Sequence, residues 1–187
     1  MESRRVLLIG KRASVLTRLA EALRTRGIEA EQTGEVTEAG VTRLAGDGGY
    51  RVVAFGRSVR EPDRTRMREA ITAANPDVVF VDGYAPIIPL FVAQFEQAFD
   101  RRPRGRRLLV DASVQDGLVD LELRSPCRLR IVSYRLGALY RTHERTVFDR
   151  EVEAGTHSAA LDTRTARAKQ AFVVIRAGDE TAALPVG

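Results

Sequence analysis

Cysteine is nearly absent from this chain, which has a single one, Cys127, in 187 residues. A lone cysteine cannot form an internal disulfide, and its neighbours lack the spacing of a zinc site, so we expect a small packing residue. No run of eighteen apolar residues occurs, and the chain starts with a short apolar stretch rather than an export signal. We therefore expect a cytoplasmic protein that does not cross a membrane.

Histidine and the common phosphate-binding motifs are also scarce. His143 and His157 are the two histidines, and neither forms a His-x-x-x-His pair or stands near a recognisable nucleophile. The chain contains neither the Gly-x-Gly-x-x-Gly pattern of dinucleotide sites nor a Gly-x-x-x-x-Gly-Lys-Ser/Thr loop. The sequence therefore predicts no catalytic residue, no metal site and no cofactor.

Only two of the thirty basic residues are lysines, Lys11 and Lys169. The net charge of +5 is spread along the chain, with an excess of two basic residues in 1–103 and of three in 104–187. One local cluster stands out, formed by Arg101, Arg102, Arg104, Arg106 and Arg107. Such a cluster could contact phosphates or acidic lipid, but we favour a solvated linker and do not expect nucleic-acid binding.

The remaining composition, 44% hydrophobic and 29% charged, is that of a folded globular protein. In the first hundred residues, apolar runs at 6–10, 28–32, 50–56 and 77–82 alternate with helical patterns at 14–26, 36–45, 62–74 and 89–99. Strands that are apolar on both faces and alternate with helices are typical of a parallel sheet covered on both sides. We predict a doubly wound α/β domain of the flavodoxin or Rossmann type.

The second half contains seven runs of strand length and no convincing helix. They cover 107–114, 118–123, 128–134, 146–152, 157–161, 171–176 and 181–186, separated by Asp-Gly, Ser-Pro, Ala-Gly and Gly-Asp turn signals. This pattern predicts a small antiparallel β-sandwich. We place the domain boundary in the arginine-rich run, giving domains 1–103 and 104–187. Residues 108–110 fit either the last strand of the first domain or the first strand of the second.

Two resemblances add to this reading. The segments CRLRIVSYRLGALYRT, EVEAGTHSAALD and AFVVIRAG make the second half resemble the Ig-like sandwich of flagellar hook-capping proteins and secretion-sorting tails, which implies a binding role. The first half looks like a degenerate response-regulator receiver in the order of its elements. Receivers need acidic residues after the first strand and an aspartate after the third, where this chain has Gly10-Lys11-Arg12 and Ala54-Phe55-Gly56. The resemblance therefore implies a pseudo-receiver without a phosphoacceptor.

Ligands of doubly wound sheets bind at the carboxyl ends of the strands. The first predicted turn offers two cations and a serine that is expected to cap the following helix, and the fourth strand ends in an aspartate. That aspartate fits a ribose or cation contact, or a turn carboxylate paired with nearby donors. The cation and hydroxyl at the third strand end fit the same ligand rim or a solvated loop. The candidate residues for a small anionic ligand are Lys11, Arg12, Ser14, Arg57, Ser58 and Asp82.

The predicted helix 89–99 is apolar over more of its surface than one sheet face requires. Something else is expected to cover it: the second domain, a second copy of the chain, or another protein. The candidate interface residues are Leu90, Phe91, Phe95 and Phe99.

These observations favour a non-enzymatic, cytoplasmic two-domain interaction or regulatory protein that binds a protein partner or dimerises through helix 89–99. The alternative is a protein, with or without enzymatic activity, that binds a nucleotide or phosphometabolite at the strand ends of the α/β domain.

Overall fold

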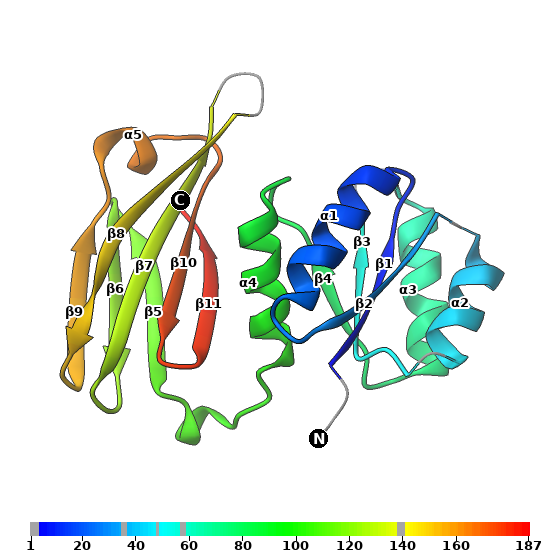
Figure 1. Cartoon of the computed structure of the whole chain (residues 1–187), viewed down its shortest axis with the longest axis horizontal. Helices are drawn as coiled ribbons and strands as arrows, with labels where there is room; N and C mark the ends of the chain where they lie inside the picture. Colours follow the sequence, from blue (N-terminus) through cyan, green and yellow to red (C-terminus); the bar gives the residue numbers. More distant parts are fainter. Residues whose placement is uncertain (1–3, 35–36, 48, 57–58, 138–140) are drawn as a thin grey trace. The chain divides into compact units, whose positions relative to one another are not determined.

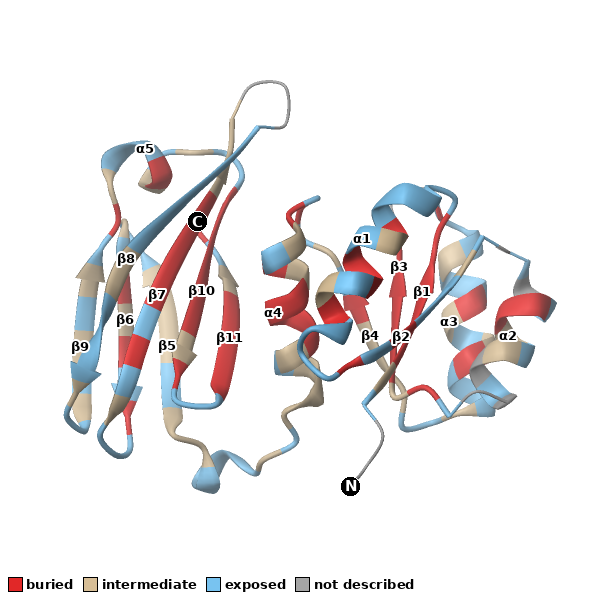
Figure 2. Cartoon of the chain, in the orientation of Figure 1, coloured by how far each residue is buried: buried red, intermediate tan, exposed pale blue. Residues whose placement is uncertain are grey.

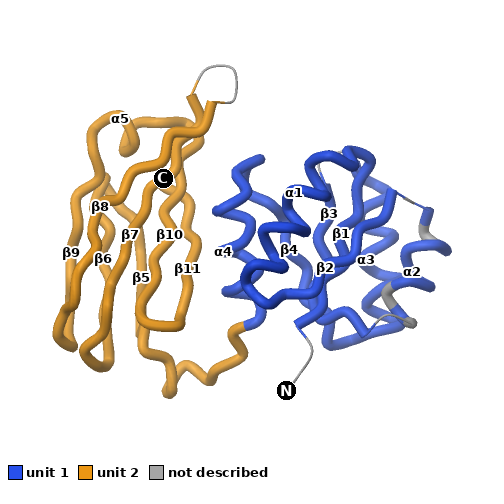
Figure 3. The backbone as a smooth tube through the Cα atoms, in the orientation of Figure 1, with its two compact units in different colours: residues 1–99 blue, residues 100–187 orange. Residues whose placement is uncertain are grey.

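The computed structural model describes residues 4–34, 37–47, 49–56, 59–137 and 141–187. The chain forms two compact units, Met1–Phe99 and Asp100–Gly187 (Figure 3). The predicted boundary at 103/104 lies just inside the second unit.

The first unit contains a parallel sheet of four strands in the order β2-β1-β3-β4 (Figure 1). The strands are β1 (Arg5–Ile9), β2 (Glu29–Thr33), β3 (Val52–Phe55) and β4 (Val79–Asp82). The helices are α1 (Ala13–Arg24), α2 (Glu38–Asp47), α3 (Asp63–Ala74) and α4 (Ile88–Phe99). The predicted alternation of strands and helices is confirmed.

Strand β1 explains why helices cover both faces of this sheet. Its side chains alternate between faces, and Val6, Leu7, Leu8 and Ile9 are all 0% exposed. Val6 and Leu8 pack with residues of α1 and α4, whereas Leu7 and Ile9 pack with residues of α2 and α3. The buried strands in Figure 2 therefore form the central layer of three.

The second unit contains two antiparallel sheets, β5-β6-β9 and β11-β10-β7-β8 (Figure 1). Their strands are β5 (Leu109–Gln115), β6 (Leu118–Leu123), β7 (Cys127–Leu136), β8 (Thr142–Val152), β9 (Gly155–Ala160), β10 (Ala171–Ala177) and β11 (Glu180–Pro185). Residues from both sheets, including Leu121 of β6, Ile131 of β7 and Val173 of β10, form one core cluster. The predicted fold class, α/β followed by all-β, is confirmed.

The first hairpin of the sandwich settles where residues 108–110 belong. Leu109 of β5 pairs with Leu123 of β6, so this segment is the first strand of the second unit. The connecting residues Asp116 and Gly117 have φ angles of 51° and 77°. Positive φ at both central residues is typical of a type I′ turn, whose twist matches that of the flanking strands. The Asp-Gly turn signal is therefore confirmed.

Some elements of the second unit differ from the prediction. Strand β8 begins at Thr142, four residues before the predicted 146, because its exposed polar residues pair with β7 through the backbone, as in the Tyr134 and Glu144 pair. An unpredicted short helix, α5 (Thr163–Ala166), follows β9 and is capped by the Asp162 side chain. A 3₁₀ turn, η1 (Arg104–Arg106), precedes β5.

Candidate functional site

The ends of β1 and β3 meet where the strand order reverses, the usual ligand position in a doubly wound sheet. A Cβ atom added to Gly10 would lie 3.5 Å from the Cα of Gly56, so the two backbones approach closely there. Gly56 N donates a hydrogen bond to Ile9 O at 2.7 Å. Lys11 and Arg12 follow directly and are exposed, which places two of the candidate cations at this edge.

Ser14 does not have the predicted capping position. Helix α1 begins at Ala13, so Arg12 is its N-cap residue, and no side chain donates or accepts a hydrogen bond at that cap. Ser14 is therefore an exposed residue of the first turn. The predicted candidates Arg57 and Ser58 lie outside the residues that the structure describes.

Asp82 is held by two arginines of α3. Its Oδ1 lies 3.4 Å from Arg64 Nη1, and its Oδ2 accepts a hydrogen bond from Arg68 Nη2. The Arg68 guanidinium also lies over the Phe80 ring, 5.1 Å from the centroid, and Phe80 stacks on Phe55. The paired-carboxylate alternative of the sequence prediction fits this geometry, with Arg64 and Arg68 as the donors.

The turn after Asp82 is fixed by α4. Gln94 is only 8% exposed; its Nε2 donates to Asp82 O at 2.9 Å, and its Oε1 accepts from Tyr84 N at 3.4 Å. The Phe91 ring lies over Gly83, where an added Cβ would come within 1.8 Å of Phe91 Cζ. This turn is therefore part of the packing between β4 and α4.

The predicted interface residues of α4 divide into two groups. Phe91, Phe95 and Phe99 belong to the core cluster that the unit forms with its own sheet. Leu90 is buried but belongs to neither core cluster of this unit. The three phenylalanines are therefore needed for the unit's own packing. Leu90 is 0% exposed, and of the four predicted residues Phe91 and Phe99 keep part of their surface accessible.

A hollow of about 620 Å³ lies along the edge strand β2, but its charged groups and the Tyr50 hydroxyl are paired with other residues that line it. Tyr50 Oη donates a hydrogen bond to Glu31. Arg5 Nε lies 3.4 Å from Glu29 Oε2, and Arg5 Cζ lies 4.9 Å from the centroid of the Tyr50 ring. Burial, and then the hydrogen bond with Glu31, raises the pKa of Tyr50 to about 12. These contacts explain the hollow as a network that stabilises the edge of the sheet.

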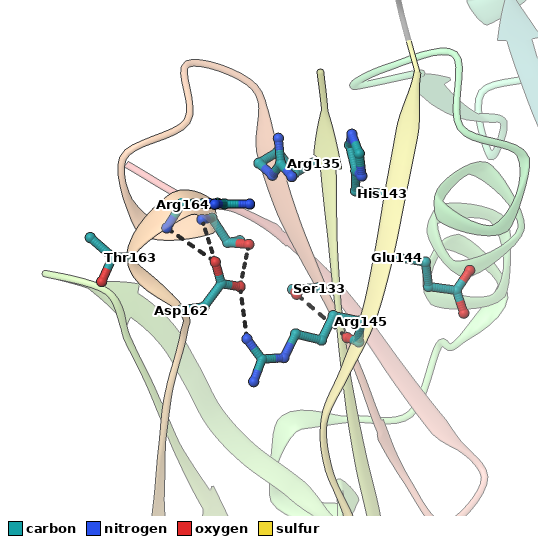
Figure 4. Close-up of a pocket in the computed structure, with 9 residues that line it drawn as sticks. Ser133, Arg135, His143, Glu144, Arg145, Asp162, Thr163 and Arg164 are labelled. Carbon is teal, nitrogen blue, oxygen red and sulfur yellow. Dashed lines mark hydrogen bonds and ion pairs between the residues drawn. The ribbon is translucent and has the colours of Figure 1, made fainter. Parts of the chain in front are cut away.

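The second unit carries a groove of about 510 Å³ that the sequence did not predict (Figure 4). One wall comes from the ends of β7 and β8, and the other from α5 and the residue before it. Its lining is polar, with three arginines, a histidine, two carboxylates and three hydroxyls. These residues are Ser133, Arg135, His143, Glu144, Arg145, Asp162, Thr163, Arg164 and Thr165.

Asp162 organises one side of this groove. Its carboxylate accepts hydrogen bonds from Arg164 N at 3.0 Å, Thr165 N at 3.1 Å and Thr165 Oγ1 at 2.7 Å, and Arg145 Nη1 lies 3.4 Å away. The hydroxyl hydrogen bond from Thr165, followed by the backbone donors and Arg145, lowers the pKa of Asp162. The carboxylate is thus held ionised by groups on both walls.

The lowered pKa predicts a pH effect on stability. Because the unfolded Asp162 takes up a proton first, near its ordinary pKa of about 3.9, its contribution is complete above that pH and is lost as pH falls through the lower folded pKa. We expect the difference in free energy of unfolding between the wild type and Asp162→Asn to narrow as pH drops from 7 to 3. Urea titrations across this range measure it, and a constant difference would contradict the assignment.

The arginine run before β5 is only partly a solvated linker. Arg102 pairs with Asp100 at 2.9 Å and with Asp179 at 3.0 Å, and Arg107 donates to the carbonyls of Arg102 and Asp100. Burial raises the pKa of Asp100, but the hydrogen bonds from Arg102 outweigh it, so that the pKa is lowered. Arg102 and Arg107 therefore hold the start of the second unit in place.

No protein-family model matches the chain, and no curated protein matches it in sequence. Among solved structures, the β-glucosidase D2-BGL from Chaetomella raphigera aligns with 10% identity and a TM-score of 0.35. The alignment covers 100% of this chain and 52% of the enzyme, so the chain spans about half of that protein's length. An overlap this low identifies neither a shared fold nor a shared function.

Two features are absent from the described residues. Their histidines, cysteines and carboxylates form no group of three that could ligate a metal ion. Their helices include none with the length and apolar character needed to cross a bilayer.

Proposed function

We propose that the chain is a non-enzymatic, cytoplasmic interaction or regulatory protein that pairs a pseudo-receiver with an Ig-like binding sandwich. The observation that supports this proposal most is the pairing of Asp82. It is the carboxylate at the described strand ends of the α/β unit, and both of its oxygens contact guanidinium groups, from Arg64 and Arg68. A carboxylate held in this way forms structural ion pairs, and we do not assign it the role of a phosphoacceptor or of a general base.

The rest of the strand-end edge agrees with this reading. A receiver would place carboxylates after β1, where this chain has the exposed cations Lys11 and Arg12. It would place its phosphoacceptor at the end of β3, where Phe55 is buried and stacks on Phe80. The unit keeps a receiver-like order of elements, but cations and aromatic packing stand where a receiver has its carboxylates. This combination suits a scaffold that binds other molecules.

The partner contact is proposed for α4, where the rings of Phe91 and Phe99 are half-buried and keep part of their surface accessible. Leu90 and Phe95 are 0% exposed within the chain, so a partner protein or a second copy of the chain would contact the exposed parts of the other two rings. We expect the protein to form one defined complex, with itself or with one other protein.

Chromatography with mass determination tests this expectation on the full chain. Phe99→Gln is expected to weaken the complex, because it removes an apolar ring that is partly exposed, whereas Asp82→Asn, at the strand ends, leaves it intact; circular dichroism checks that both variants fold. A strictly monomeric protein without a copurifying partner, or turnover of any substrate that Asp82→Ala abolishes, would refute the proposal.

The alternative function, binding of a nucleotide or phosphometabolite at the strand ends, is favoured by the close approach of Gly10 and Gly56 beside Lys11 and Arg12. A ligand that binds the folded state raises the melting temperature once its concentration exceeds Kd. The alternative predicts such a rise with a nucleotide or sugar phosphate, and its loss in a Lys11→Gln/Arg12→Gln variant. If the melting temperature still rises in this variant, the ligand binds at another site and the alternative is wrong.

A further inference from the structure

The inner face of β7 changes character along the strand. Leu129 and Ile131 belong to the sandwich core, and the next two residues of the same face are Ser133 and Arg135. Strand β8 continues this change, since Arg145 pairs with Ser133 and His143 pairs with Arg135. The space between the sheets, apolar over most of its length, therefore becomes a polar groove at one end.

The floor and the rim of this groove differ in chemistry. Ser133 and Thr165 are 2% and 4% exposed, so hydroxyl groups form the buried part. Arg135 is half-buried, while His143, Arg145 and Arg164 are exposed. Arginine and histidine side chains thus surround a floor of hydroxyls, and the groove is open to solvent.

The positive charges exceed the negative charge that faces them. Asp162 already accepts three hydrogen bonds and pairs with Arg145. The other carboxylate, Glu144, points to the far side of β8 in Figure 4. With the charge of Asp162 set against that of Arg145, the guanidinium groups of Arg135 and Arg164 remain, which leaves about two positive charges for a ligand.

Three side chains at one end of the groove could donate hydrogen bonds to a ligand. Figure 4 shows Arg135, His143 and Arg164 near one another at that end. Within the part of the chain that the structure describes, none of these three side chains has a hydrogen-bond or ion-pair partner among the protein groups.

We propose that this groove binds a small phosphate monoester. A phosphate monoester carries a charge of about −1.5 to −2 at neutral pH, which matches the excess positive charge. Arginine forks donate pairs of parallel hydrogen bonds to phosphate oxygens, and Arg135 and Arg164 supply two forks from opposite walls. The groove volume of about 510 Å³ lies within the usual range for small-molecule sites, about 300–1,000 Å³.

This site goes beyond the proposed interaction function and does not depend on it. It lies wholly in the second unit, whereas the strand-end alternative uses Lys11 and Arg12 of the first. Phosphate binding at the groove would give the protein a small-molecule ligand whether or not it forms a complex.

Calorimetric titration of the full chain with inorganic phosphate and with phenyl phosphate, at constant ionic strength, tests the proposal. We expect saturable binding of both, weakened about tenfold to a hundredfold in Arg135→Gln and in Arg164→Gln, because each loses charge-assisted hydrogen bonds. Acetate, a monoanion, is expected to bind at least about tenfold more weakly than phosphate.

Arg106→Gln is the matched control, because Arg106 is an exposed arginine of the same unit and does not line the groove. It should leave the phosphate Kd unchanged within about twofold, since a single exposed charge outside the site has little effect. The proposal would be overturned by the absence of saturable binding, by an equal loss in Arg106→Gln, by acetate binding as tightly as phosphate, or by loss in Lys11→Gln/Arg12→Gln instead.

Discussion

Replacing Gly83 by alanine is expected to lower the free energy of unfolding of the α/β unit by about 3 kcal/mol, at the upper end of the usual cost of overpacking. An added Cβ would lie 1.8 Å from Phe91 Cζ and 2.1 Å from Phe91 Cε1. No such approach is tolerated, so the ring or the backbone of the turn must move. By comparison, a Cβ added at Gly117 would come no closer than 2.9 Å to a neighbouring atom.

The Phe91 ring cannot move away without disturbing other contacts. It packs against the core cluster and stacks on Phe95, with ring centroids 6.4 Å apart, and Phe95 is itself 0% exposed. The alternative movement, of the backbone at residue 83, would stretch the hydrogen bonds that Gln94 makes to Asp82 O and Tyr84 N. Either route breaks packing between β4 and α4, and this is why the expected cost is high.

A double-mutant cycle with Phe91→Ala tests this explanation. Once the ring is removed, Gly83→Ala should cost less than about 1 kcal/mol, so the two substitutions should be strongly non-additive. Hydrogen exchange of peptides from residues 1–99 assigns the change to this unit. The control is Gly46→Ala, where α2 offers open space around the new Cβ and helix propensity predicts no loss, or a gain of up to about 1 kcal/mol. Equal costs for Gly83→Ala in both backgrounds would show that the ring is not the cause.

The fold class, α/β followed by all-β, could be predicted from the sequence because the relevant signals are local. The run Val6 to Ile9 is apolar at every position, which predicts a strand buried on both faces, and the structure confirms it. Asp116 and Gly117 indicate a two-residue hairpin, and their φ angles fit it. The polar start of β8 was missed because residues such as His143 and Glu144 show no apolar alternation and depend on pairing with β7.

The groove could not be predicted because its residues are close only after the sheets pack. Arg135, Arg145 and Arg164 come from β7, β8 and α5, with no motif spacing among them. One signal was present: along β7, Leu129 and Ile131 are followed at the same two-residue spacing by a serine and an arginine, so the inner face becomes polar. Similarly, the apolar character of α4 was visible, but not that its three phenylalanines pack against the unit's own sheet.

Glu180 is a further residue whose role was hidden in the sequence. It follows the Gly-Asp turn between β10 and β11, a place where a charged side chain is expected to be solvated. Instead it is 3% exposed. Its carboxylate accepts hydrogen bonds from Leu108 N at 2.7 Å and Leu109 N at 2.9 Å, and lies 3.3 Å from Arg102 Nη1. The Glu180 carboxylate therefore joins the start of β5, where the chain enters the sandwich, to the β10–β11 hairpin at its end.

Glu180→Ala is accordingly expected to lower the free energy of unfolding of the second unit by about 3 kcal/mol. It leaves the two backbone N–H groups without their acceptor and removes the buried partner of Arg102. Glu180→Gln should cost less, because its amide oxygen can still accept one of the two hydrogen bonds. Urea unfolding, with hydrogen exchange of peptides from residues 100–187, measures both variants and shows whether protection is lost first at 108–109.

Asp179→Ala is the control that separates this buried clamp from simple charge pairing. Asp179 is the neighbouring residue and contacts the same arginine, Arg102, at 3.0 Å, but its side chain is 81% exposed. An exposed ion pair of this kind contributes at most about 1 kcal/mol. If Asp179→Ala were as costly as Glu180→Ala, the stability would come from the charge on Arg102. If only Glu180→Ala is costly, it comes from the buried carboxylate and the two N–H groups that it binds, as the geometry predicts.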